Sequence, residues 1–252
     1  MIPPLVSFVI VMMIWQLAVL AFSIPPYVLP GPIDVARAGL DQASVLIGST
    51  WWTAMAALAG FVASLVVGVL IAFAFSQSRL IRRGLYPYAI FLQTVPIVAI
   101  APLIILWFGT GFRSVVLVSF MISLFPIITN VTSGLLQVDA ASRDLFRLYR
   151  ATRVQTLLKL QIPHAVPYVV AGARISSGLS VIGAIVGEFF AGYGASQHGL
   201  GYVIVLSSGQ LKTALLFAAI FMSTFLGLVI FTTVGWAGDR VLSRWQDKEP
   251  IS

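Results

Sequence analysis

The 252-residue sequence has no cysteine, and charged residues make up only 9% of it. The absence of cysteine excludes disulfide bonds, thiol catalysis and cysteine-ligated metal sites. Soluble domains carry about 25% charged residues, whereas 59% of this chain is hydrophobic and its mean hydropathy is +1.01. A soluble protein of this size has too little interior for so much apolar surface. The composition therefore predicts an integral membrane protein.

Catalytic and nucleotide-binding motifs are also missing from the sequence. It has no G-x-x-x-x-G-K-[ST] phosphate loop, no H-E-x-x-H zinc motif and no G-x-S-x-G nucleophile motif. Its two histidines, His164 and His198, are predicted to lie on opposite sides of the membrane and cannot share a metal ion. We therefore expect neither a catalytic site nor a metal site, and a membrane enzyme is a weak alternative.

Six apolar stretches are long enough to cross a bilayer as helices, which takes about 20 residues. The alternation over about ten residues that is typical of a membrane β-barrel strand is absent. We therefore predict an all-α membrane protein with about six transmembrane helices. The stretches are residues 5–24, 51–75, 85–108, 115–136, 164–189 and 214–236.

Prolines interrupt the third stretch at Pro87, Pro96 and Pro102, so its helix is expected to bend or break. Interrupted membrane helices often line a cavity, where freed backbone groups find polar partners. Polar residues near these breaks are therefore candidates for a translocation pathway. On the third and fourth stretches these candidates are Gln93, Thr94 and Asn130.

Two charged residues, Arg174 and Glu188, lie within the fifth stretch. They are 14 residues apart, or about 21 Å along a helix, so they cannot pair with each other. A charge at membrane depth normally faces the bundle interior or water. Each residue either lines the translocation pathway or is a structural ion paired with a loop or a neighbouring helix.

Ala56, Gly60 and Ser64 recur at four-residue spacing in the second stretch. Small residues in this pattern allow another helix to approach closely. The pattern is equally compatible with a contact between subunits and with packing inside the bundle.

The distribution of basic residues predicts the orientation, because Lys and Arg collect in cytoplasmic loops. If residues 76–84, residues 137–163 and the C-terminal tail share one side, that side holds eleven of the fifteen basic residues. These segments are therefore predicted to be cytoplasmic, and six spans place both termini there as well. The same rule explains the net charge of +7 without a nucleic-acid partner. The eleven residues are Arg79, Arg82, Arg83, Arg143, Arg147, Arg150, Arg153, Lys159, Arg240, Arg244 and Lys248, against Arg37, Arg113 and Lys212 outside.

The longest polar interruption is residues 139–163, DAASRDLFRLYRATRVQTLLKLQIP, called here the coupling segment. Asp139 and Arg143 have the spacing of a helical ion pair. Residues 150–153 are predicted to separate two short helices, the second of which ends at Pro163 because proline lacks a backbone donor. The segment either stabilises the fold at the membrane surface or docks a cytosolic partner.

This segment resembles the cytoplasmic signature of ABC importer permeases, E-A-A-x3-G-x9-I-x-L-P. The matching residues are Asp144-Leu145-Phe146, then Arg150, and then the LQIP sequence that ends at Pro163. Arginine replaces the glycine of the turn, which costs about 1 kcal/mol or more if the backbone is left-handed there. The stretches VPIVAIAPLIILWFGTGFRS, AGARISSGLSVIGAIVGEFFAG and GLGYVI resemble the nitrate, sulfonate, taurine and bicarbonate branch of this family.

The resemblance implies a type I ABC importer permease of the bacterial inner membrane, working by alternating access. It implies a homodimeric pore, a dimer of cytosolic ATPase subunits, and a periplasmic or lipid-anchored substrate-binding protein. ATP and Mg²⁺ are then bound by the ATPase, and this chain needs no cofactor. The residues implied for ATPase contact are Asp144, Leu145, Phe146, Arg147, Leu148, Arg150, Ala151 and Pro163.

The resemblance also implies a division of the chain. Residues 1–48 are the first transmembrane helix and an external loop, residues 49–240 are the permease core, and residues 241–252 are a cytoplasmic tail. The external segments 24–48 and 193–212 are expected to meet the binding protein.

An ion-gradient-driven secondary transporter is the alternative function. It predicts acidic residues deep in several spans, and Glu188 alone approaches that description. The substrate stays open, because related permeases serve nitrate, sulfonates, taurine, bicarbonate, riboflavin or thiamine precursors. A heterodimer with a second permease also stays open.

Overall fold

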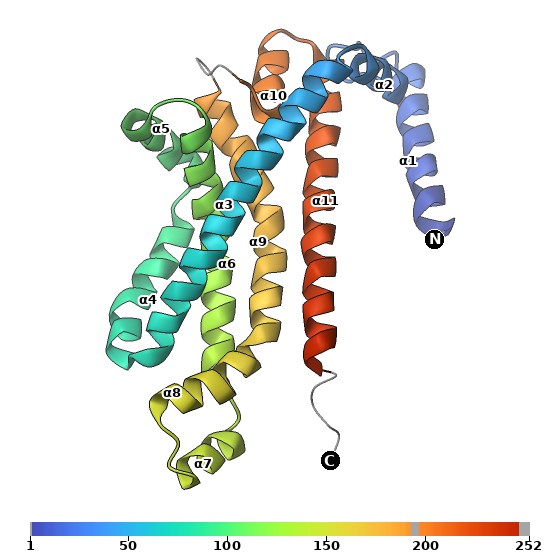
Figure 1. Ribbon diagram of the computed structural model, residues 1–252. Coiled ribbons are helices and arrows are strands. Elements are labelled where there is room, and N and C mark those ends of the chain that lie inside the picture. Colours follow the sequence, from blue (N-terminus) through green and yellow to red (C-terminus); the bar gives the residue numbers. More distant parts are fainter. Residues whose placement is uncertain (1, 193–196, 247–252) are drawn as a thin grey trace.

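Long helices lie side by side along most of the length of the molecule in the computed structural model, which describes residues 2–192 and 197–246 (Figure 1). In these residues, four helical stretches are long and apolar enough to cross a membrane. The prediction of an all-α membrane protein is confirmed. The four stretches are Ala43–Gln77, Phe112–Leu136, Arg153–Ala191 and Thr213–Arg244.

These stretches correspond to α3 (Ala43–Gln77), α6 (Phe112–Leu136), α9 (Ile162–Ala191) with the turns before it, and α11 (Thr213–Gln246). The first predicted span is α1 (Ile2–Ala21). The tail predicted to begin at residue 241 is still helical, because α11 continues to Gln246, and residues 247–252 lie outside the described part of the chain.

The third predicted span is divided into α4 (Arg79–Thr94) and α5 (Ile97–Phe108). The break falls at Val95 and Pro96, as the sequence predicts, whereas Pro87 and Pro102 lie inside the helices. The predicted loop 76–84 is wrong. Ser78 accepts a hydrogen bond from the backbone of Ile81 and so caps α4, which begins one residue later.

The predicted external segment 193–212 contains a helix, α10 (Leu200–Gly209). Residues 193–196 of that segment lie outside the described residues. The other predicted external segment, residues 24–48, contains α2 (Pro32–Asp41). Both helices lie at the same end of the molecule (Figure 1).

The core of the bundle is α6, which packs between α3 and α9. Ala56, Gly60 and Ser64 are all buried there. The Ser123 hydroxyl of α6 donates to the Ser64 hydroxyl at 3.0 Å. This row of small residues therefore serves packing inside the bundle, and its interpretation as a subunit contact is wrong.

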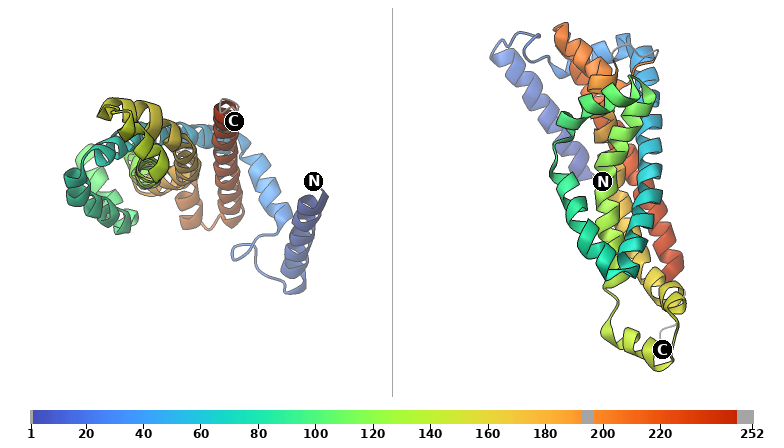
Figure 2. Two further views of the ribbon diagram at one scale, coloured as in Figure 1. Left: turned by 90° about the horizontal axis from the view of Figure 1, so that it is seen from below. Right: turned by 90° about the vertical axis from the view of Figure 1, so that its left-hand side faces the viewer.

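The coupling segment forms the end of the molecule opposite α2 and α10 (Figures 1 and 2). It contains α7 (Ala140–Leu148), α8 (Arg153–Thr156) and the π-helical turn η1 (Leu157–Gln161). The prediction that Pro163 ends the second helix is wrong, because η1 continues directly into α9. The backbone N–H of Ile162 donates to the carbonyl of Leu157, five residues back. We attribute this continuity to the wider turn and to the first-turn position of Pro163, where its missing N–H matters little.

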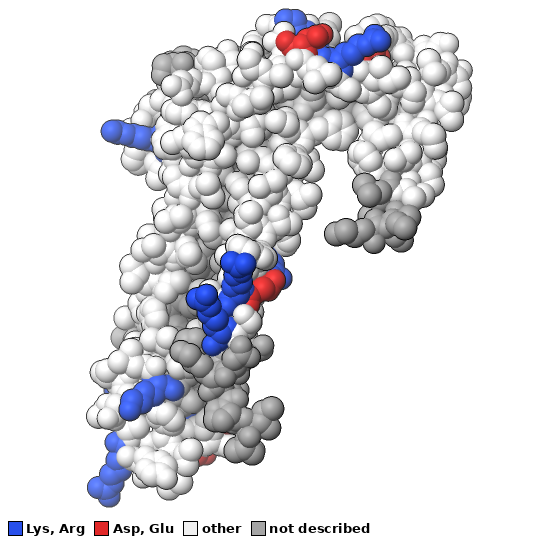
Figure 3. Space-filling view, turned by 45° about the vertical axis from the view of Figure 1, so that its right-hand side comes forward, with Lys and Arg blue, Asp and Glu red and all other residues white. Residues whose placement is uncertain are grey.

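Charged side chains gather toward the two ends of the molecule. The face shown in Figure 3 has a band without charged residues between an upper and a lower group. Helix α1 stands apart from the bundle (Figure 2) and contacts α11 through Trp15, whose ring lies 5.8 Å from that of Phe217. An apolar cavity of about 620 Å³ lies among α1, α2, α3 and α11.

Candidate functional site

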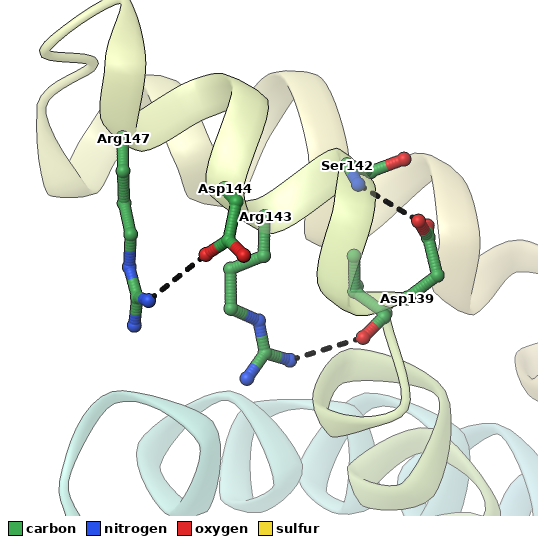
Figure 4. Close-up of polar contacts among 6 residues, drawn as sticks. Asp139, Ser142, Arg143, Asp144 and Arg147 are labelled. Atoms are coloured by element: carbon green, nitrogen blue, oxygen red, sulfur yellow. Dashed lines mark hydrogen bonds and ion pairs between the residues drawn. The ribbon is translucent and has the colours of Figure 1, made fainter.

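The coupling segment begins with a capped helix. The carboxylate of Asp139 accepts a hydrogen bond of 2.7 Å from the backbone of Ser142, and this bond holds the pKa of Asp139 below its usual value. The Arg143 guanidinium donates to the carbonyl of Leu136 at 2.9 Å, at the end of α6. Figure 4 shows the Asp139 carboxylate directed at the Ser142 backbone and the Arg143 guanidinium directed away from that carboxylate. These two contacts replace the predicted ion pair between Asp139 and Arg143. They attach α7 to the C-terminal end of a transmembrane helix.

The outer face of α7 carries part of the set predicted to contact the ATPase. Phe146 is half-buried, and Arg150, Ala151 and Pro163 lie beyond the end of α7. Arg147 and Asp144 form an ion pair of 3.1 Å, with their side chains 75% and 64% exposed. Leu148 is 81% exposed, and Tyr149, just after the helix, is 79% exposed. Large apolar side chains beside charges, at the end of a membrane bundle, are typical of an uncovered protein interface.

Arg150 closes α7 in a left-handed conformation, with φ of +47°. Its N–H donates to the carbonyl of Arg147, and the N–H of Ala151 donates to the carbonyl of Phe146, both at 2.9 Å. These two bonds form a Schellman motif, in which the left-handed position normally belongs to glycine. This left-handed conformation explains why the signature has glycine at the turn. In this chain Arg150 adopts the same conformation, which is unfavourable for a residue with a side chain.

Replacing Arg150 by glycine is expected to stabilise this turn by about 1 kcal/mol, because glycine carries no penalty in the left-handed region. Hydrogen exchange at the Ala151 amide measures the effect, and we expect it to slow about fivefold. The matched change Tyr149→Gly, at φ of −78°, is expected to speed this exchange. Faster exchange in Arg150→Gly would contradict our assignment of strain to Arg150.

Just beyond this turn, Thr152 starts the second helix with a capping box. Its hydroxyl accepts from the Gln155 backbone at 3.2 Å, and the Gln155 side chain accepts from the Thr152 backbone at 2.8 Å. The coupling segment is therefore a helix, a closed turn and a second helix that enters the membrane as α9.

A second cavity, of about 660 Å³, lies among α3, α4, α5 and α6. Gln93 and Thr94 line it together beside the break at Pro96, and their role in a translocation pathway stays a prediction. Phe75, Tyr88 and Phe125 are also in its wall. The cavity therefore combines aromatic rings with the side-chain amide of Gln93, and none of the described residues in its lining is charged.

The three other pathway candidates lie away from this wall. Asn130 donates to the carbonyl of Pro126 at 2.8 Å. Arg174 donates to Asp239 of α11 at 2.8 Å. Glu188 is only 2% exposed and accepts a hydrogen bond of 3.0 Å from the Thr53 hydroxyl. The contacts of Arg174 and Glu188 fit the structural interpretation that the sequence left open.

Thr53 is a residue that sequence reasoning missed. It lies 135 positions from Glu188 in an apolar span. No sequence pattern indicates that a threonine in such a span contacts Glu188. The α10 helix was also missed, although its GLGYVI sequence stood out by resemblance.

Comparisons with known proteins agree with the fold. The family model for the binding-protein-dependent transport system inner membrane component matches residues 64–245. The formylaminopyrimidine transport permease protein ThiX of Halalkalibacterium halodurans is 31% identical, over 98% of this chain and 96% of its own length. The riboflavin transport system permease protein RibX of Chloroflexus aurantiacus is 32% identical, over 96% and 89%.

A solved structure shares the fold. A chain of the MetNI methionine ABC transporter, in an inward-facing conformation, superposes with a TM-score of 0.66 at 17% identity, covering 81% of this chain and 98% of that chain. The family match favours an ATP-driven importer over the ion-gradient alternative. The chain thus belongs to the binding-protein-dependent transport system inner membrane components, and it is the permease subunit of an ABC importer for small solutes, with ATP hydrolysis left to a separate subunit.

Proposed function

We propose that two copies of this chain form the pore and that each coupling segment docks on one subunit of a cytosolic ATPase dimer. The observation that carries this proposal is the exposed face of α7, with Arg147, Leu148 and Tyr149 at one end of the bundle. ATP and Mg²⁺ bind to the ATPase. A periplasmic or lipid-anchored binding protein delivers the solute at the opposite end, and both termini of the permease are cytoplasmic.

The geometry supports a mechanism of alternating access. Closure of the ATPase dimer displaces α7 and α8, and η1 transmits this displacement to α9 because no break separates them. The Val95–Pro96 break lets α4 and α5 change their relative angle at the cavity that holds Gln93 and Thr94. The same residues thereby face the two sides of the membrane in turn.

The apolar cavity beside α1 supports the homodimer. Phe8, Met12 and Trp15 of α1 line it from one side, and Phe221 and Phe225 of α11 line it from the other. A transmembrane helix of a second copy has enough apolar surface to fill this cavity. In such a dimer, α1 of each copy packs against that helix of the other copy.

The cavity near the Val95–Pro96 break supports a flat, uncharged solute. Aromatic walls stack on planar rings, and the amide of Gln93 supplies both a donor and an acceptor. The names of two relatives refer to formylaminopyrimidine and riboflavin, both of which are planar heterocycles. These two solutes are therefore the first to offer in a transport assay.

Masking of a thiol tests the docking of the ATPase. The chain has no cysteine, so Tyr149→Cys introduces a single exposed thiol at the end of α7. We expect the ATPase subunit to slow maleimide labelling of this thiol about tenfold or more, because residues inside an interface lose access to solvent. Native mass measurement of the same complex is expected to show two permeases and two ATPase subunits.

Ser44→Cys, exposed in the first turn of α3, is the control and is expected to label at the same rate with and without the ATPase. Equal labelling of Tyr149→Cys in the free permease and in the complex would exclude α7 from the interface.

A further inference from the structure

Helix α10 begins without a cap of its own. Its N-cap residue is Gly199, which has no side chain to accept from the first amides of the helix. Leu200 is 0% exposed and Gly201 is buried as well, so water cannot accept hydrogen bonds from their backbone N–H groups. A buried N–H without a partner is costly, and α10 therefore needs acceptors from elsewhere in the fold.

Two other helices supply these acceptors. The backbone N–H of Leu200 donates to the Thr53 hydroxyl of α3 at 2.8 Å. The backbone N–H of Gly201 donates to the Glu188 carboxylate of α9, also at 2.8 Å. The Thr53 hydroxyl lies 3.0 Å from the same carboxylate oxygen and 3.0 Å from the carbonyl of Ser49, so its single proton is shared between these two acceptors. Thr53 and Glu188 together form a shared cap for α10, and the carboxylate suits the positive end of the helix dipole.

Two glycines allow α10 to approach this closely. A Cβ at Gly199 would collide with the carboxylate of Glu188, and a Cβ at Gly201 would lie 2.7 Å from the Cβ of Glu188. Both collisions involve Glu188 of the shared cap, and at Gly201 the nearest atom is the carbonyl oxygen of Ile185, also in α9. The G-L-G sequence at the start of α10 is therefore matched to Glu188 by shape as well as by hydrogen bonding.

The shared cap lies at the opposite end of α9 from the coupling segment. The helical stretch Arg153–Ala191 has 39 residues and spans about 58 Å at 1.5 Å per residue. Glu188 is three residues before its end, while α7 and α8 are at its start (Figure 1). Any displacement of α9 therefore acts directly on the acceptor that holds α10.

We infer that Glu188 and Thr53 are positioning residues for transport, because their shared cap makes α10 follow α9 when the ATPase moves the coupling segment. This inference rests on the proposed docking of the ATPase. It assigns to α10 the role of an external element whose position reports the nucleotide state of the cytosolic subunits.

Hydrogen exchange on the permease–ATPase complex, compared without nucleotide and with ATP and vanadate, tests this inference. In the wild-type complex we expect nucleotide to change the exchange of the α10 amides. Thr53→Val removes the hydroxyl while keeping the shape. We expect it to speed exchange at Leu200 about tenfold and to abolish the nucleotide response of that amide. The response of Gly201, whose acceptor is Glu188 itself, is expected to persist in Thr53→Val and to be lost in Glu188→Met. Thr53→Ser is expected to restore both properties, and Ser123→Ala, which removes a buried hydroxyl elsewhere in the bundle, is expected to leave the nucleotide response intact.

The possible failures have different meanings. A nucleotide response of Leu200 that persists in Thr53→Val, a response of Gly201 that persists in Glu188→Met, or no response of α10 in the wild-type complex would overturn the inference while protection of α7 by the ATPase stands. Loss of that α7 protection would instead overturn the proposed docking. A purely structural role for the cap predicts faster exchange with an unchanged nucleotide response, and that result would also refute coupling through α10.

Discussion

Reversing the charge of Arg147 to glutamate is expected to abolish transport and stimulation of the ATPase while leaving membrane insertion intact. Arg147 is exposed on α7 and lies beside Leu148, at the centre of the proposed ATPase contact. The change removes the ion pair with Asp144 and places two acids together. Like charges in an interface cost several kcal/mol, and a loss of about 2 kcal/mol already weakens docking roughly 30-fold.

Co-purification of the ATPase subunit and its hydrolysis rate measure this effect. Arg79→Glu is the matched control, because it makes the same charge change on the same side of the membrane, at the exposed start of α4. We expect the control to retain docking. Undiminished docking and transport in Arg147→Glu would remove this residue from the proposed contact.

Replacing Gly60 by alanine is expected to destabilise the bundle severely. A Cβ at this position would lie 2.6 Å from the Cβ of Ser119 and 2.9 Å from the backbone nitrogen of Phe120. Because one of these atoms belongs to the α6 backbone, no side-chain rotation relieves the collision, and α3 and α6 must separate. Overpacking of this kind costs about 3 kcal/mol.

Gly48 provides an internal comparison on the same helix. A Cβ there meets nothing within 4 Å, so Gly48→Ala is expected to be neutral or stabilising by up to about 1 kcal/mol. Thermal unfolding of the purified permease distinguishes the two variants. Equal melting temperatures would show that α3 and α6 can adjust at Gly60 without cost.

Local patterns in the sequence predicted the features that depend on one stretch of chain. Apolar length located the transmembrane helices, and Pro96 located the break between α4 and α5. The spacing of the signature placed Asp144 and Arg150 within α7 and its closing turn. Each of these inferences uses a rule that acts over a few residues, and no distant contact overrides it.

The features that were missed depend on distant partners or on a compromise between local rules. Helix α10 begins where Thr53 and Glu188 cap it, and no sequence pattern links either residue to the start of this helix. Pro163 does not end a helix, because the π turn before it changes the hydrogen-bond spacing. Such turns have no simple sequence signature.

The π turn at Leu157–Gln161 also sets the direction in which the coupling segment points. A π turn has the effect of one residue inserted into an α-helix, and each residue rotates a helix by about 100°. The face of α8 is therefore turned by about that angle from the face that an uninterrupted α9 would present. A change of a single residue at this turn therefore alters the direction of α7 and α8, and with them of the proposed docking surface, without altering the packing of α9 in the bundle.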